Sequence, residues 1–248
     1  GHGGMATVHL AHDVKHGRTV AIKVLRPELA QAVGSERFLR EINIAAQLQS
    51  PHVLPLLESG EADGLLFYVM PYVQGDSLRG LIAKRGALAP SEAMRLLRDI
   101  VDGLAHAHRH GVVHRDIKPD NVMIAERHAL VVDFGVAKAL RDATAHHDLT
   151  SIGISLGTPS YMAPEQAAAD PNIDHRADIY SVGVVAYEML AGKTPFSGTP
   201  QAVLTAQITS TPEPLLQVKP DVPPAVAQLV MKCLEKNPAL RFQTADEL

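Results

Sequence analysis

Apolar residues in the first seventy positions fall into short runs that predict β-strands. Such runs occupy residues 8–11, 19–25, 53–57 and 65–70. The second run, TVAIKVL, is rich in the β-branched residues that strands favour. A Glu-Ala-Asp-Gly turn at 61–64 precedes the last run. Residues 35–49 instead predict a helix, because apolar residues recur every three or four positions at Phe38, Ile42, Ala45 and Leu48.

From Gly75 onward the pattern is mainly helical. Pro90 and Glu92 fit the first turn of a helix whose apolar stripe continues to Ala105. Residues 178–191 are apolar on nearly every side, which predicts a helix at the centre of a large lobe. Further helices are predicted to begin at Thr199-Pro200 and at Pro223-Pro224, the latter ending at Asn237-Pro238, and a capping box of Thr244 and Glu247 predicts one more. The pattern therefore indicates an α+β fold, with a small strand-rich part before a larger helical part.

Composition narrows the possible functions. The 248 residues suit one large domain or two smaller units, and 46% hydrophobic with 20% charged residues is ordinary for a globular protein. A net charge of −4 offers no general basic field for nucleic acid, and one cysteine, Cys233, cannot form an internal disulfide. No apolar run approaches 18 residues and no signal peptide is present, so we expect no membrane contact by this segment.

The most specific signal is the sequence HRDIKPDN at 114–121, followed by DFG at 133–135. Each residue alone has an ordinary interpretation, such as a turn, a helix cap or a solvated charge. Seven specified positions together have a chance probability on the order of 10⁻⁹ per register. The joint pattern therefore indicates a functional motif.

These motifs resemble those of the eukaryotic-like protein kinases, and the resemblance covers essentially all 248 residues. Lys118 and the sequence GTPSYMAPE at 157–165 resemble the serine/threonine subgroup of this family. Three segments are similar to those of its bacterial members: GGMATVHLA, HRDIKPDNVMI and GTPSYMAPEQA. The resemblance implies a bilobal fold, with an N-lobe at 1–70, a hinge at 71–74 and a C-lobe at 75–248. It also implies that the chain is a fragment of a kinase domain, lacking the first strand and the very C-terminal end.

The resemblance assigns the chemistry of phosphoryl transfer to four residues. Asp116 would accept the proton of the substrate hydroxyl, and Lys118 would hold positive charge beside the transferring group. Asn121 and Asp133 match the metal ligands, and their oxygen donors suit Mg²⁺, with Mn²⁺ as an alternative.

The triphosphate of ATP is expected to lie against the glycine-rich loop and Lys23. Gly1 and Gly3 match the loop glycines, although Ala6 stands where the family has a third glycine. Lys23 ends an apolar strand run and could be a surface lysine. Glu41, however, lies in the apolar stripe of the helix at 35–49 and needs a partner, so we expect the two to pair. In kinases that pair fixes the lysine on the phosphates, although the periodicity alone also allows a half-exposed Glu41.

The adenine is expected to lie at the hinge. Met70 matches the residue at the back of the adenine site, followed by the hinge residues Pro71 and Val73. Pro71 stands where bacterial relatives often have Glu, which the family tolerates because only the carbonyl is used there. Val8, Ala21 and Met123 would enclose the ring, and each is equally suited to an ordinary core.

Other residues match regulatory or structural positions of the family. Thr150 and Ser151 are candidates for phosphorylation, with Arg115 and Lys138 as basic partners, and a solvated, unmodified hydroxyl is the alternative for each. Thr158 is expected to contact Asp116 and Lys118. Asp178 and the Glu165–Arg241 pair are expected to hold the fold. A zinc site among His106, His108 and His110 is disfavoured, because no carboxylate or cysteine completes it.

The sequence thus predicts a serine/threonine protein kinase that uses ATP and Mg²⁺ and phosphorylates protein substrates, including its own activation loop. A catalytically weak pseudokinase scaffold and a small-molecule phosphotransferase are the alternatives. Lys23, Asp116 and Asp133 are all present, which argues against the first alternative. We expect self-association for trans-autophosphorylation, no nucleic-acid partner, and a cytoplasmic location, in which a segment outside this sequence could tether the domain to a membrane.

Overall fold

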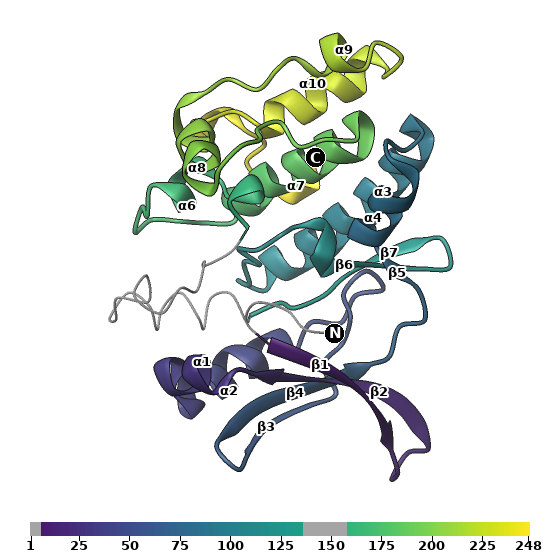
Figure 1. The fold of residues 1–248 in the computed structure, drawn as a ribbon, viewed down its shortest axis with the longest axis vertical. Coiled ribbons are helices and arrows are strands. Elements are labelled where there is room, and N and C mark those ends of the chain that lie inside the picture. The colour runs from purple at the N-terminus through teal and green to yellow at the C-terminus, as the bar shows by residue number, and fades with distance from the viewer. Residues whose placement is uncertain (1–5, 136–157) are drawn as a thin grey trace.

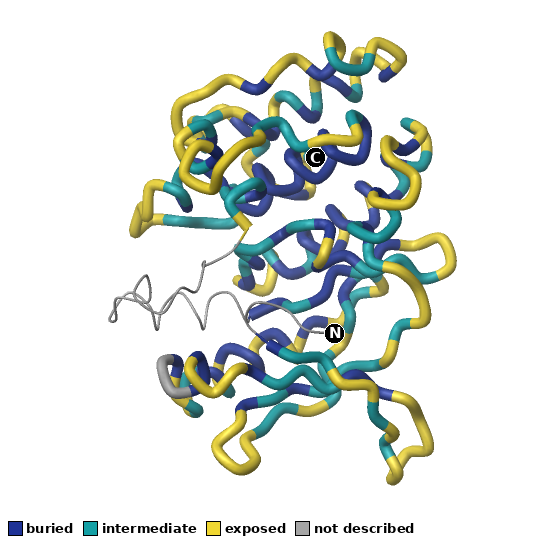
Figure 2. Tube along the Cα trace, in the orientation of Figure 1, coloured by how far each residue is buried: buried dark blue, intermediate teal, exposed yellow. Residues whose placement is uncertain are grey.

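The computed structural model describes residues 6–135 and 158–248, which form two stacked parts (Figure 1). The N-terminal part contains an antiparallel sheet with two helices beside it, and the C-terminal part is mainly helical. Burial is concentrated inside each part and along their junction (Figure 2). The predicted α+β fold with a small antiparallel sheet is therefore confirmed.

Four strands form the N-terminal sheet in the order β1-β2-β4-β3. They are β1 (Ala6–Asp13), β2 (Arg18–Leu25), β3 (Glu58–Ala62) and β4 (Leu65–Pro71). Asp63 and Gly64 have φ values of 50° and 75°, which makes the tight turn between β3 and β4. The predicted strands at 8–11, 19–25 and 65–70 thus lie within observed strands.

The predicted strand at 53–57 is wrong. Within this segment only Val53 forms a β-bridge, to Val131. The edge strand that pairs with β4 is instead the polar β3, which follows the predicted segment in the chain. Pro55 has no backbone N–H to donate to a ladder, and edge strands commonly carry polar residues. The apolar pattern therefore indicated the wrong segment.

Two helices adjoin this sheet, α1 (Pro27–Val33) and α2 (Ser35–Ala45). The second confirms the predicted helix but ends at Ala45, four residues early, while Leu48 is still buried. Phe38 and Ile42 of α2 pack with Leu29, Leu66 and Tyr68 into a separate N-terminal core.

The described residues of the C-terminal part form five helices of eight residues or more: α3 (Leu78–Arg85), α4 (Pro90–Arg109), α7 (Arg176–Ala191), α8 (Pro200–Thr209) and α10 (Pro224–Cys233). Helix α7 is buried without interruption from Ala177 to Leu190, as predicted for a central helix. A small sheet of β5 (Asp76–Ser77), β6 (Val122–Ala125) and β7 (His128–Val131) lies at the junction with the N-terminal part.

Short helical turns complete this part: α6 (Pro164–Ala167), α9 (Leu215–Val218), and 3₁₀ turns at Pro119–Asn121, Pro159–Tyr161, Pro238–Leu240 and Ala245–Glu247. Helix α10 ends at Cys233, before the predicted stop at Asn237. The predicted capping box is also wrong. Thr244 makes no side-chain cap hydrogen bond, and Glu247 accepts instead from the Gln243 backbone N–H.

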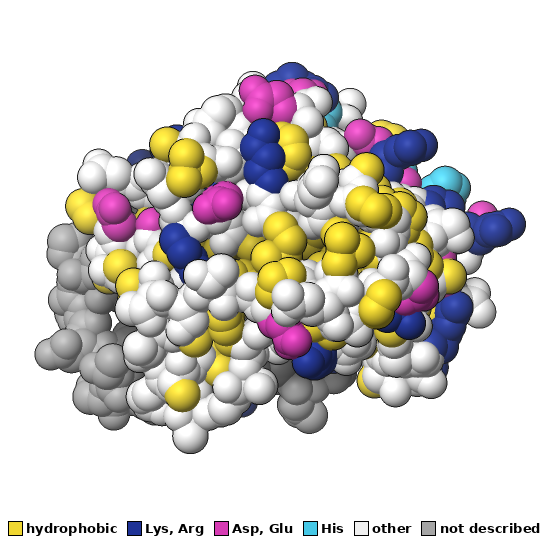
Figure 3. Space-filling view, turned by 90° about the horizontal axis from the view of Figure 1, so that it is seen from above, with side chains coloured by type: hydrophobic (Ala, Val, Ile, Leu, Met, Phe, Trp, Pro, Cys, Tyr) yellow, Lys and Arg dark blue, Asp and Glu magenta, His cyan; other side chains and the backbone are white. Residues whose placement is uncertain are grey.

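The end of the molecule formed by the C-terminal part shows apolar, acidic and basic side chains interspersed (Figure 3). Large exposed apolar residues include Leu216 and Leu240. Among the helices of residues 6–135 and 158–248, none has the length and apolar character needed to cross a membrane.

Close packing between α7 and α10 depends on Gly183. A Cβ added there would lie 2.6 Å from the Cβ of Cys233, whereas one added at Gly80 in α3 would meet nothing nearer than 3.6 Å. We predict that Gly183→Ala lowers the free energy of unfolding by about 1–3 kcal/mol through overpacking. Gly80→Ala, the control, should raise it by up to about 1 kcal/mol because alanine is the better helix former. Thermal melts of both variants measure this, and an unchanged Gly183→Ala melt would contradict the packing argument.

Candidate active site

The loop from Val112 to Lys118 is anchored on a buried carboxylate at the start of α7. Asp178 accepts hydrogen bonds from the backbone N–H groups of His114 (2.8 Å) and Arg115 (2.7 Å). His108 Nε2 lies 2.8 Å from Asp178 Oδ2. Burial would raise the pKa of Asp178, but the His108 contact, nearby charges and the Arg115 N–H hold it below its ordinary value. The carboxylate therefore stays charged and fixes the loop.

Arg115 adopts a left-handed backbone conformation, with φ of 66°. That conformation is unfavourable for a non-glycine residue and persists only where surrounding contacts enforce it. Its N–H is held by Asp178, and its carbonyl accepts from Gln166 Nε2 at 2.9 Å. The turn before Asp116 is thus fixed on both sides.

Asp116 lies at the centre of a polar cluster. Its Oδ2 accepts from Lys118 Nζ at 2.6 Å and from Asn121 Nδ2 at 3.1 Å. Asn121 Nδ2 also donates to the Asp116 carbonyl at 2.8 Å. The three predicted catalytic residues of this loop are therefore brought together.

His114 connects this loop to the DFG segment. Its Nδ1 accepts from the Asp116 N–H at 3.2 Å, so Nε2 carries the ring proton and donates to the Val132 carbonyl at 2.8 Å. The Val132 N–H donates in turn to the Asn121 carbonyl at 3.0 Å. The backbone directly before Asp133 is therefore hydrogen-bonded to the loop that carries Asp116 and Asn121.

Asp133 is held from the N-terminal part by two donors. Lys23 Nζ lies 2.5 Å from Oδ2, and Tyr68 Oη donates to Oδ1 at 2.6 Å. Burial would raise the pKa of Asp133, but the Lys23 charge and the two hydrogen bonds hold it below its ordinary value. Burial and the Asp133 charge raise the pKa of Tyr68 well above its usual value, so the phenol keeps its proton.

The expected pairing of Lys23 with Glu41 is not formed in this structure. Lys23 pairs with Asp133 instead, because that buried carboxylate also requires a compensating charge. Glu41 is buried in α2, as its place in the apolar stripe suggested, and Arg40 Nη2 lies 3.6 Å from its carboxylate. Its backbone carbonyl lies against Gly135.

The donor set at Asn121 and Asp133 fits a hard cation. The nitrogen of the Asn121 amide is used by Asp116, which leaves Oδ1 as the remaining acceptor. With the Asp133 carboxylate, this supplies the oxygen ligands that Mg²⁺ prefers, and Mg²⁺ takes few protein ligands. Within the described part of the chain, no group of three or more His, Cys, Asp or Glu is arranged to hold a metal on its own.

The predicted adenine residues come from adjacent strands. Val8 of β1 pairs with Lys23, and Ala21 of β2 pairs with Met70 of β4. Met123 of β6 pairs with Ser77 of β5, on the C-terminal side of the junction. Pro71 ends β4, and Val73 lies in the connection from β4 to β5.

Five predicted residues lie outside the described residues: Gly1, Gly3, Lys138, Thr150 and Ser151. Thr158 is described and exposed, and it precedes the 3₁₀ turn at Pro159–Tyr161. Among the described residues no hydrogen bond joins it to Asp116 or Lys118, and its expected contact with them stays a prediction.

The Glu165–Arg241 pair predicted to hold the fold is present. Arg241 donates to both Glu165 oxygens, at 2.6 and 2.8 Å, and its side chain is fully buried. It also donates to the backbone carbonyls of Arg176, Glu235 and Lys236.

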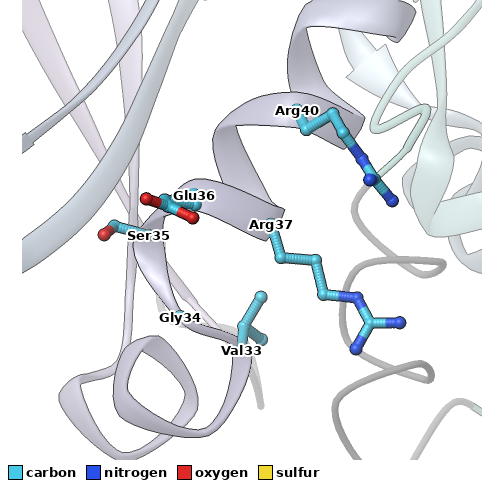
Figure 4. A pocket seen from close by; sticks show the side chains of 6 residues that line it. All are labelled: Val33, Gly34, Ser35, Glu36, Arg37 and Arg40. Carbon is cyan, nitrogen blue, oxygen red and sulfur yellow. The ribbon is translucent and has the colours of Figure 1, made fainter.

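Sequence reasoning missed Tyr68 as a site residue. The available signal was a hydroxyl-bearing residue within an otherwise apolar strand, which gives no information about where that hydroxyl points. A pocket of about 720 Å³ at the end of α1 and the start of α2 was also not foreseen, and Figure 4 shows the side chains of Arg37 and Arg40 extending to the same side of α2. None of the predicted site residues in the described part of the chain lines this pocket.

Comparison with known proteins gives a consistent picture. The sequence profile described as "Protein kinase domain" matches residues 1–248. Serine/threonine-protein kinase PknB of Mycolicibacterium smegmatis is 41% identical over 100% of this chain and 40% of its own length. PknB of Mycobacterium tuberculosis is 38% identical over 100% and 40%, and a probable serine/threonine-protein kinase, pknA2, of Bifidobacterium longum is 41% identical over 99% and 33%. The chain therefore spans less than half the length of these relatives.

Loss of the Glu165 charge would leave the buried Arg241 guanidinium uncompensated. We predict that Glu165→Gln lowers the free energy of unfolding by about 3–5 kcal/mol. Glu92→Gln is a matched control, because its Arg85 partner is half exposed, and should cost about 1 kcal/mol or less. Chemical denaturation compares the two, and equal losses would contradict the structural role of the buried pair.

Proposed function

The chain belongs to the protein kinase family, and we propose that it transfers the γ-phosphate of ATP to serine and threonine hydroxyls of proteins. The observation that carries this proposal is the hydrogen-bonded cluster of Asp116, Lys118 and Asn121, whose loop is also hydrogen-bonded to the backbone of Val132, the residue before Asp133. Phosphoryl transfer needs positioning and compensation of phosphate charge more than covalent chemistry. A fixed cluster of one base, one cation and two oxygen ligands meets that need.

Asp116 is the proposed base. Its Oδ2 is held by Lys118 and Asn121, so the carboxylate has a fixed orientation from which to accept the proton of a substrate hydroxyl. Lys118 carries the positive charge that contacts Asp116, and it would stabilise negative charge on the transferring phosphoryl group.

Asn121 and Asp133 are the proposed ligands of Mg²⁺, with Mn²⁺ as an alternative. When bound, the ion neutralises charge on the ATP phosphates. The chain contributes two oxygen donors whose relative position is set by the Val132–Asn121 hydrogen bond.

Lys23 is the proposed phosphate-binding cation. It lies on β2 two residues after Ala21, so strand alternation puts its side chain on the same face of the sheet as that proposed adenine contact. To bind phosphates it would turn at least one of its three N–H donors to the nucleotide. Glu41 is retained as its proposed partner in that arrangement, because the α2 backbone at Glu41 packs against Gly135.

Val8, Ala21, Met70 and Met123 are proposed to enclose the adenine, with the Pro71 carbonyl and the Val73 backbone as hinge contacts. Gly1 and Gly3 are proposed to approach the phosphates. We also propose an N-lobe at 1–70, a hinge at 71–74 and a C-lobe at 75–248.

Protein substrates, self-association and autophosphorylation at Thr150 or Ser151 are further proposals, and so is a cytoplasmic location of the domain. A pseudokinase scaffold is the alternative. The intact Lys23–Asp133 and Lys118–Asp116 pairs favour the active enzyme.

Asp116→Asn removes the proposed base while keeping the side-chain volume. We predict that transfer falls by about 10²–10⁴-fold, because the substrate hydroxyl loses its proton acceptor. Nucleotide affinity, measured by calorimetry, should stay nearly intact. Asp120→Asn is the control, since Asp120 lies in the same loop but is exposed and pairs with Arg79. Equal rates for the protein and Asp116→Asn would refute the assignment.

Removal of divalent metal by a chelator should stop transfer, and added Mg²⁺ should restore it. Asp133→Asn should reduce the rate by at least about 10²-fold at a fixed Mg²⁺ concentration, since the anionic ligand is lost. Initial rates across a Mg²⁺ titration measure both effects. Full activity of Asp133→Asn at low Mg²⁺ would overturn the ligand assignment.

A further inference from the structure

Both oxygens of the Asp133 carboxylate have a donor, and the two donors differ in kind. Lys23 Nζ contacts Oδ2, and the Tyr68 hydroxyl donates to Oδ1 at 2.6 Å. Lys23 is a flexible side chain with 18% exposure, while Tyr68 has none. The neutral donor is therefore the more firmly placed of the two.

Tyr68 is fixed by its strand and by its core contacts. Strand β4 is paired on both sides, with Lys23 of β2 and Ser59 of β3 opposite Tyr68. Its ring packs against Phe38 of α2, with ring centres 6.4 Å apart. The hydroxyl consequently points at Asp133 from a position that the N-terminal core determines.

Lys23 Nζ has three N–H donors, and binding of ATP phosphates would divide them between the nucleotide and Asp133. Among the described residues, the Tyr68 hydroxyl is the other side-chain donor to this carboxylate, and its hydrogen bond does not involve the nucleotide. One hydrogen bond leaves lone pairs on both oxygens, so it can orient the carboxylate without blocking a metal.

We propose that Tyr68 is a positioning residue, whose hydroxyl holds the Asp133 carboxylate in the orientation that binds the divalent cation. This inference rests on the proposed metal role of Asp133. Carboxylates that bind metals are commonly oriented by a hydrogen bond from a second residue, and losing that bond commonly weakens metal binding by about 10–100-fold.

The test is Tyr68→Phe, which keeps the ring and its contact with Phe38 but removes the donor. Tyr187→Phe is the matched control, because Tyr187 is also buried and its hydroxyl donates to the Glu213 carbonyl on another part of the molecule. For each protein, Mg²⁺ is titrated into the complex with a non-hydrolysable ATP analogue and followed by calorimetry. Steady-state rates give kcat and KM, and thermal melts confirm that each variant is folded.

For Tyr68→Phe we expect the Mg²⁺ concentration at half-saturation to rise by about tenfold and kcat to fall, with affinity for the metal-free analogue within about twofold of the unaltered protein. Tyr187→Phe should match the unaltered protein in Mg²⁺ affinity. An unchanged Mg²⁺ midpoint in Tyr68→Phe would overturn the proposal. A lower midpoint would overturn it too, since the hydroxyl would then compete with the metal.

Asp133→Asn separates this inference from its premise. If Asp133→Asn loses Mg²⁺ binding while Tyr68→Phe keeps it, the positioning role fails and the metal role of Asp133 stands. If Asp133→Asn binds Mg²⁺ as tightly as the unaltered protein, the metal role fails and the inference fails with it.

Discussion

The site depends on one buried carboxylate, that of Asp178, which accepts hydrogen bonds from the backbone N–H groups of His114 and Arg115. A buried charge is costly unless hydrogen bonds compensate it, so this arrangement is stable only in one loop geometry. That geometry forces Arg115 into a left-handed conformation and places Asp116 beside Lys118 and Asn121. Helix α7, buried along its length, supplies the rigid base.

A second constraint joins the two parts of the molecule. Asp133 belongs to the C-terminal part, yet the two side-chain donors that contact it among the described residues, Lys23 and Tyr68, come from the N-terminal sheet. Charge compensation therefore links the proposed metal ligand to the position of β2 and β4. A shift of the sheet relative to the C-terminal part would change the surroundings of that ligand directly.

Much of the fold and of the candidate site could be predicted from the sequence. The α7 helix could be predicted because a buried helix is apolar on every side. The loop at 114–121 could be predicted because catalytic chemistry restricts the residue types at each position. The strand at 53–57 was placed wrongly because apolar content did not reveal the missing donor of Pro55. Periodicity showed that Glu41 is buried but could not choose its partner, since that depends on the distance between β2, α2 and Asp133. The role of Tyr68 depends on the direction of one hydroxyl, which is set by the three-dimensional packing of β4 and not by any local sequence pattern.

Incubation with ATP labelled at the γ-phosphate and Mg²⁺, followed by mass spectrometry of the protein and of a general protein substrate, tests the central claim most directly. The account predicts label on serine or threonine side chains. Absence of label on both, from protein that binds the nucleotide, would contradict it and favour a scaffold that binds ATP without turnover.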